Sequence, residues 1–247
     1  IYEEASFTAS ETTVCKNERF TLTASGDTSK ISKYQWRLGN GTWFTGLKVL
    51  DTFFTANGNQ SVELIITNKY GGCTDTATMN ALINVVGPVT AFVPAVPGTC
   101  QNNSVSFTDQ TSSNANIVKW TWDFGDSTIR EFTAAPFVHT YADTGTYTVK
   151  LIVEDVNGCT DTLSKDSVIT ISRPVAYFGV SDTIYCQEKD LQFIDSSQGY
   201  SLGYEWTFGD GATSTLQNPT HAYTGADAVY SVRLKVTDGF GCTDSLT

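Results

Sequence analysis

The chain has 247 residues, enough for one large domain or two to three small ones. Only 17% of them are charged, while Thr, Ser, Val, Tyr and Phe are abundant, and this composition favours strands over helices. The formal net charge of -11 argues against nucleic acid and anionic membrane surfaces as partners, and no apolar run is long enough to span a bilayer.

Four landmarks recur in the same order at a spacing of about 85 residues. They are a phenylalanine, a cysteine eight residues later, a tryptophan, and the cysteine of a Gly-Cys-Thr-Asp sequence. The landmarks are Phe7, Cys15, Trp36 and Cys73, then Phe92, Cys100, Trp122 and Cys159, then Phe178, Cys186, Trp206 and Cys242. We therefore expect three copies of one module: module 1 (residues 1–87), module 2 (88–173, opened by Pro88) and module 3 (174–247, opened by Pro174).

Strand signals follow in chain order within each module. Apolar residues alternate with polar ones at 62–66, at 104–108, 118–122 and 147–153, and again at 230–236. The last run of each module ends in a glycine-bearing turn and resumes at Cys-Thr-Asp, which predicts a hairpin. About seven short strands in 85 residues are typical of an immunoglobulin-like β-sandwich, with the recurring tryptophan between its sheets.

The third copy of the module is shorter than the other two. It stops at Leu246-Thr247, where the second continues through Ile171, so most of its final strand is absent. Because an open sheet edge invites aggregation, we expect the chain to be a fragment of a longer protein. The fold class predicted is all-β, with three tandem sandwiches of which the last lacks most of its final strand.

Modules 2 and 3 resemble the PKD (polycystic kidney disease) domain family. Its Trp-Asp-Phe-Gly-Asp-Gly hallmark is matched at 122–126 and 206–211, and its Pro-x-His-x-Tyr motif at 219–223 and, more loosely, at 136–141. Module 1 departs from the pattern at 36–41 and has no Pro-x-His-x-Tyr, so its assignment rests on the landmark spacing. The cysteine placement is similar to that in large surface proteins of Bacteroidetes, such as gliding-motility adhesins exported by the type IX secretion system.

The resemblance implies a non-catalytic stalk segment of an extracellular or cell-surface protein, without cofactors. Its partners would be neighbouring repeats and surface polysaccharide or other cell-surface proteins, with no nucleic acid and no membrane insertion. The alternative is an accessory spacer or a carbohydrate- or protein-binding region of a secreted hydrolase.

Three carboxylates could suggest acid–base chemistry: Asp123, Asp126 and Asp210. No pair of them persists between modules, and Asp is a usual turn former, so we expect them to shape the turn after the tryptophan strand. His139 and His221 are expected to be hydrogen-bonded packing residues. No catalytic residue is predicted.

Resemblance to PKD-like modules of collagenases raises calcium as a ligand. Asp155 and Asp238 match one position of that site, and Asn68 stands there in module 1. The expected pair of aspartates is missing from the loops at 109–114 and 195–199, so no metal is predicted.

Module 1 has an unusually aromatic middle, formed by Trp43, Phe44, Phe53 and Phe54. A flat aromatic strip can stack on sugar rings, but a repacked core is the interpretation we favour.

The Bacteroidetes resemblance also implies O-glycosylation, at Asp-Ser/Thr followed by an apolar residue or Thr. The alternative is that Asp-Thr pairs are simply common in Thr-rich strands. The candidate acceptors are Thr76, Thr162, Ser245, Thr183, Ser167 and Ser127.

Six cysteines with no Cys-x-x-Cys pair and only two histidines indicate disulfides and an oxidising compartment. The local choice is one bond per module: Cys15–Cys73, Cys100–Cys159 and Cys186–Cys242. The two cysteines of a module, however, fall in the A–B and F–G turns, which lie at opposite ends of a Greek-key sandwich. A seven-residue strand separates those ends by roughly 23 Å, whereas a disulfide needs Cα atoms about 5.5–6 Å apart. We therefore favour Cys15–Cys159 and Cys100–Cys242 between modules over the local pairs, with Cys73 and Cys186 bonded to further repeats.

Overall fold

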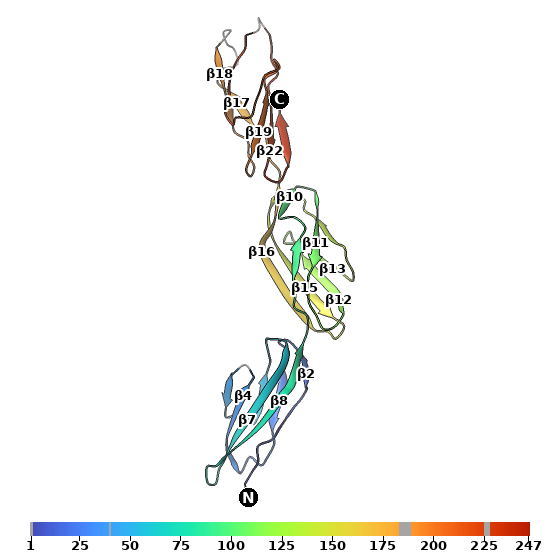
Figure 1. Ribbon diagram of the computed structural model, residues 1–247, viewed down its shortest axis with the longest axis vertical. Helices are drawn as coiled ribbons and strands as arrows, with labels where there is room; N and C mark the ends of the chain where they lie inside the picture. Colours follow the sequence, from blue (N-terminus) through green and yellow to red (C-terminus); the bar gives the residue numbers. More distant parts are fainter. Residues whose placement is uncertain (1, 40, 183–188, 225–227) are drawn as a thin grey trace.

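The computed structural model describes residues 2–39, 41–182, 189–224 and 228–247. Within these ranges every regular element is a β-strand, so no helix there is long and apolar enough to cross a membrane. Three β-sandwiches follow one another end to end and give an elongated molecule (Figure 1). The predicted fold class, all-β with tandem immunoglobulin-like sandwiches, is confirmed.

Module 1 packs a three-stranded sheet, in the order β1-β3-β6, against a five-stranded sheet in the order β2-β8-β7-β4-β5. Its strands are β1 (Phe7–Ala9), β2 (Thr13–Cys15), β3 (Phe20–Ala24), β4 (Ile31–Leu38), β5 (Trp43–Thr45), β6 (Val49–Thr52), β7 (Gly58–Asn68) and β8 (Thr74–Val86). In immunoglobulin terms β1, β2, β3, β4, β7 and β8 are strands A, A′, B, C, F and G.

Module 2 repeats this plan with sheets β14-β11-β9 and β10-β16-β15-β12-β13. Its strands are β9 (Phe92–Pro94), β10 (Gly98–Cys100), β11 (Ser104–Asp109), β12 (Ile117–Asp123), β13 (Ile129–Phe132), β14 (Phe137–Thr140), β15 (Gly145–Asp155) and β16 (Thr160–Ser172). Here β10 is strand A′, β15 is strand F and β16 is strand G.

Module 3 has sheets β17-β18-β21 and β20-β19-β22-β23. Its strands are β17 (Phe178–Val180), β18 (Asp190–Asp195), β19 (Gly203–Thr207), β20 (Thr213–Ser214), β21 (Thr220–Ala222), β22 (Arg233–Thr237) and β23 (Thr243–Leu246). Strand G is four residues long here and thirteen in module 2, as predicted.

The recurring tryptophan is the centre of each core. Trp36, Trp122 and Trp206 are fully buried, which confirms the predicted architecture. The phenylalanine of strand A meets each indole edge to face, with ring centroids 5.2 Å apart in module 1, 5.0 Å in module 2 and 5.1 Å in module 3. Truncating a buried aromatic of this kind costs about 3–5 kcal/mol, so these two landmarks recur because they hold the sheets together.

The aromatic middle of module 1 departs from the prediction. Phe54 is buried and Phe44 packs partly against the core, but Trp43 is 49% exposed and Phe53 42% exposed. A core role was therefore wrong for Trp43 and Phe53. Trp43 lies on β5, an edge strand, and each ring is covered by an arginine instead: Arg37 lies over Trp43 at 5.6 Å and Arg19 over Phe53 at 5.7 Å.

In modules 1 and 2, strand A′ positions one cysteine at the end where the chain leaves the module. β2 runs parallel to the C-terminal part of β8, with Cys15 opposite Val86, and Cys100 lies opposite Ser172 in the same way. The other cysteine lies at the F–G turn, where strand G begins. A 13-residue strand G is roughly 40 Å long, so the two cysteines of one module lie at opposite ends.

Candidate functional site: the junctions between modules

Two disulfides join successive modules. Cys15 of module 1 is bonded to Cys159 of module 2 with a Cα–Cα distance of 5.3 Å, and Cys100 of module 2 to Cys242 of module 3 at 5.5 Å. These are the two pairs that the topological argument favours. They lie 144 and 142 residues apart in sequence, and the chain-entropy account assigns about 5 kcal/mol of stabilisation to the closure of each loop.

The two remaining cysteines are not part of these bonds. Cys73 lies exposed at the F–G turn of module 1 and is the one cysteine of the described residues outside a disulfide. Cys186 falls outside the described residues, so its expected partner in a further repeat stays a prediction.

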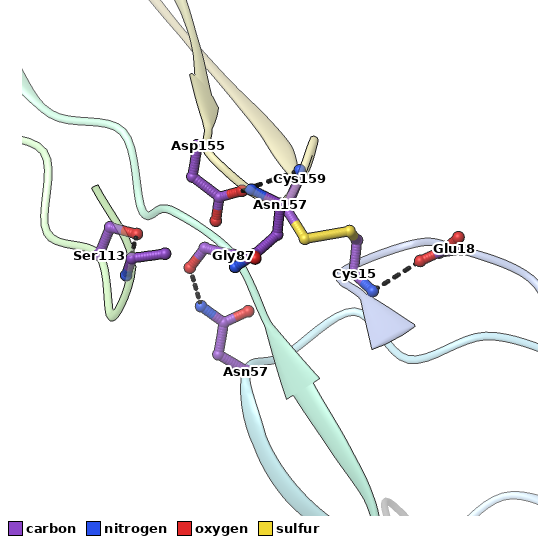
Figure 2. Close-up of a disulfide and its surroundings, with 9 residues drawn as sticks. Cys15, Glu18, Asn57, Gly87, Ser113, Asp155, Asn157 and Cys159 are labelled. Carbon is purple, nitrogen blue, oxygen red and sulfur yellow. Dashed lines mark hydrogen bonds between the residues drawn. A yellow bond between two sulfur atoms is a disulfide. The ribbon is translucent and has the colours of Figure 1, made fainter. Parts of the chain in front are cut away.

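An aspartate shapes each of the two F–G turns that carry a bonded cysteine. Asp155 Oδ1 accepts the backbone N–H groups of Asn157 at 2.9 Å and Cys159 at 3.0 Å (Figure 2). Asp238 Oδ1 does the same in module 3, with two distances of 2.9 Å. Both carboxylates are buried, at 2% and 5% exposure, so their role in this structure is to hold the turn and hence the direction of the cysteine.

The same two aspartates were the candidates for calcium. A hard cation takes six to eight oxygen ligands, several of them carboxylates. Among the described residues no three His, Cys, Asp or Glu side chains come together in a group that could hold a metal ion. That no metal binds at Asp155 and Asp238 stays a prediction.

An ion pair crosses the first junction beside the disulfide. Lys16 Nζ of module 1 contacts Asp161 Oδ1 of module 2, and each side chain is only 17% exposed. Asp161 Oδ2 accepts the backbone N–H of Thr90 at 2.8 Å. Partial burial raises the pKa of Asp161, but the Lys16 ammonium and the Thr90 amide outweigh it and keep the pKa below its ordinary value, so the carboxylate stays charged.

The aspartate of Gly-Cys-Thr-Asp has the same backbone partner in all three modules. Asp75 accepts the N–H of Ala5 at 2.7 Å, and Asp244 accepts that of Ala176 at 2.9 Å, as Asp161 does from Thr90. The motif thus ties strand G to the segment that enters strand A. The sequence shows that the motif recurs in every module, whereas the partner of its aspartate is visible only in the structure.

Two hydrogen bonds from module 1 hold the first linker. Asn57 Nδ2 donates to the carbonyl of Gly87 at 2.8 Å (Figure 2). The N–H of Lys16 donates to Val86 O at 3.0 Å. Gly87 has φ of +133°, and a Cβ there would lie 3.3 Å from Cys159 Cβ. Glycine therefore allows both the backbone turn and the close approach of the two modules.

Each hallmark aspartate pairs with the histidine of its module, and of these side chains His139 is buried while Asp210 is exposed. His139 Nε2 and Asp126 Oδ2 lie 2.6 Å apart, and the imidazole stacks on Phe124 at 4.1 Å. His221 and Asp210 repeat the contact at 2.7 Å in module 3. Burial raises the pKa of Asp126, but hydrogen bonds from His139 and Thr128 outweigh it and lower the pKa.

Asp123, the third carboxylate considered, accepts the N–H of Gly125 at 3.0 Å within the turn after β12. All three carboxylates thus act on the shape and support of that turn.

The candidate glycan acceptors lie on the surface. Those within the described ranges are all exposed, while Thr183 falls outside these ranges. The exposed acceptors are Thr76, Thr162, Ser245, Ser167 and Ser127. Accessibility is therefore no obstacle, and their modification stays a prediction.

The PKD domain family matches the chain three times, over residues 4–83, 86–171 and 172–247. The chain belongs to the PKD domain family. The match includes the degenerate first copy. PKD domains are generally non-catalytic modules of extracellular proteins. The expected boundaries after residues 87 and 173 stay a prediction.

Among curated proteins, these PKD domains are similar to parts of collagenases. The chain is 27% identical over 176 residues to collagenase ColA of Clostridium perfringens, covering 68% of this chain and 15% of that protein. It is 44% identical over 57 residues to collagenase ColA of Bacillus cereus (22% and 6%), and 55% identical over 42 residues to a microbial collagenase of Vibrio alginolyticus (17% and 5%). The chain thus spans 15% or less of the length of these relatives.

Solved structures with similar folds include the N-terminal four Ig domains of Dscam1 isoform 6.44, with a TM-score of 0.31, 11% identity, and coverage of 99% of this chain and 72% of that one. The fibronectin(III)-like modules of Clostridium thermocellum CbhA have a TM-score of 0.28 and 13% identity, covering 67% of this chain and 93% of theirs. Neither likeness bears on function or on the arrangement of the PKD modules.

Proposed function

We propose that this chain is a non-catalytic stalk segment of a large secreted cell-surface protein of the gliding-motility adhesin type. The observation that carries the proposal is the covalent bond across each of the two junctions, Cys15–Cys159 and Cys100–Cys242. A disulfide within a module stabilises that module alone, whereas one between modules restrains the angle between them. A stalk that holds a binding region away from the cell needs this restraint.

Charge and chemistry support an extracellular site of action. Disulfides persist in oxidising compartments, and the net charge of -11 keeps a long rod soluble. Export by the type IX system of a Bacteroidetes species is the finer proposal, which rests on the placement of the cysteines. In that setting Cys73 would bond to the A′ cysteine of a further repeat, because it occupies the position that Cys159 and Cys242 occupy in their modules.

Small-angle X-ray scattering tests the stalk. The oxidised chain is expected to scatter as one straight rod with a sharply defined maximum dimension. The double variant C15S/C100S, which keeps every module but loses both junction bonds, should show a broad distribution of shapes. An oxidised chain as flexible as this variant would contradict the proposal.

The collagenase relatives favour a second candidate, an accessory spacer or a carbohydrate- or protein-binding region of a secreted hydrolase. Co-sedimentation with insoluble collagen separates the two. The stalk predicts that this chain stays in the supernatant, whereas pelleting with collagen would favour the accessory role. The full gene gives an independent test, since many further repeats indicate a stalk and one hydrolase domain the alternative.

A further inference from the structure

The second junction contains an aromatic contact beside its disulfide. Phe240, at the tip of the F–G turn of module 3, packs on Gly98 in β10 of module 2. A Cβ placed on Gly98 would lie 2.3 Å from Phe240 Cε1, far inside van der Waals contact. On the module 3 side the ring stacks on Tyr200, with centroids 5.5 Å apart and an interplanar angle of 21°. The ring is therefore held between Tyr200 and a backbone that has no side chain.

The first junction has different residues at the same two positions. Thr13 begins β2 as Gly98 begins β10, each two residues before the bonded cysteine. Asn157 matches Phe240, because the N–H of each donates at 2.9 Å to the aspartate that caps its turn. The first junction thus combines a β-branched residue on strand A′ with a small polar residue at the tip of the F–G turn. The second combines glycine on strand A′ with an aromatic residue at that tip.

We infer that these two positions form a matched pair that determines which module can dock on which. The inference deepens the proposed stalk function by adding a rule for module order. The steric reason is direct, since threonine at position 98 would overlap the Phe240 ring in its observed place. Phe240 lies two residues before Cys242, and its ring is stacked on Tyr200, so we expect a threonine at position 98 to displace the turn and disfavour the Cα–Cα distance that the disulfide needs.

The matched pair also distinguishes the correct bonds from the wrong ones during oxidation. Cys15 and Cys100 lie at equivalent ends of their modules, so strand geometry alone would allow Cys15 to meet Cys242 of another copy. In that wrong junction Thr13 would face Phe240, the combination that the second junction avoids. A module with an aromatic residue at the tip of its F–G turn therefore needs a partner whose strand A′ has the sequence Gly-x-Cys.

A double-mutant cycle in the whole chain tests the pair, in a C73S/C186S background to avoid bonds between molecules. The effective concentration of each cysteine pair is measured by equilibration with glutathione, using G98T, F240N and G98T/F240N. We expect G98T to lower the effective concentration of Cys100 and Cys242 at least tenfold. In the F240N background the same change should lower this effective concentration less than threefold, because Thr and Asn reproduce the residues of the first junction.

The Cys15–Cys159 bond reports on the folding of module 2 in every variant, so its persistence in G98T excludes simple unfolding. T13G is the matched control and should leave both junctions within twofold of the parent. An effect of G98T that is equal in both backgrounds, or absent, would overturn the matched pair. The scattering difference between the oxidised chain and C15S/C100S would still stand in that case, so the stalk proposal is judged separately.

Discussion

The two junction bonds limit how far the chain can be stretched even when every module is unfolded. They create two nodes, Cys15 with Cys159 and Cys100 with Cys242, joined by three segments of chain. The shortest is the segment from Cys100 to Cys159, about 59 residues, which reaches about 200 Å at 3.3–3.6 Å per residue. Reduction leaves a single path of about 227 residues from Cys15 to Cys242, which reaches about 800 Å. The extension between these points should therefore rise about fourfold on reduction.

Optical tweezers with handles at the two chain ends measure this length directly. The oxidised chain is unfolded at a force that spares disulfides, a phosphine reductant is added, and the gain in contour length is recorded. The variant C15S/C159S separates the junction bonds from the local pairs. With Cys100–Cys242 intact, the path from position 15 to position 242 is about 85 residues, or about 300 Å. Local pairing would instead leave a path of about 171 residues, or about 600 Å, between the same two positions.

Two results would refute the reasoning. One is an oxidised chain that extends to about 800 Å before reduction, which would mean that the junction bonds are absent. The other is a C15S/C159S chain that extends to about 600 Å, which would mean bonds within modules. C73S serves as the control and should change none of these lengths.

Three further predictions follow from the sites described. Peptide mapping without reduction should recover the linked pairs Cys15–Cys159 and Cys100–Cys242, and a Cys100–Cys159 peptide would contradict the junction bonds. Because hydrogen bonds from His139 and Thr128 outweigh burial and lower the pKa of Asp126, its carboxylate stabilises the fold above the unfolded pKa near 4, and this contribution is lost as the pH falls through the lower folded pKa. D126N should cost about 1–3 kcal/mol at pH 7 and flatten the acid slope in urea titrations, and an unchanged slope would show that the contact contributes nothing. Native material should exceed the bare polypeptide in intact mass because of O-glycans, and should lose the excess when the exposed acceptors are replaced by alanine.

The landmark residues made the fold predictable from the sequence. Trp122 and Phe92 recur because each module must fill the space between two sheets, and an indole with an edge-on phenyl ring fills it in all three. Burial of this kind depends on residue type and strand period, which are local properties of the sequence. The cysteine pairing could be predicted from the general topology of the sandwich, because the two cysteines of one module lie at opposite ends of a long strand and cannot reach each other.

Only the tertiary structure decided the contacts between residues that are far apart in the sequence and share no local sequence pattern. Lys16 meets Asp161, and Phe240 meets Gly98, only because strand A′ of one module ends against the F–G turn of the next. Trp43 is exposed because β5 lies at a sheet edge, where Arg37 lies over the ring. Such contacts depend on the placement of whole sandwiches, and the free energies that select them arise from complementary shape and charge across a surface. The sequence contains these residues, but their partners are specified only once the modules are stacked.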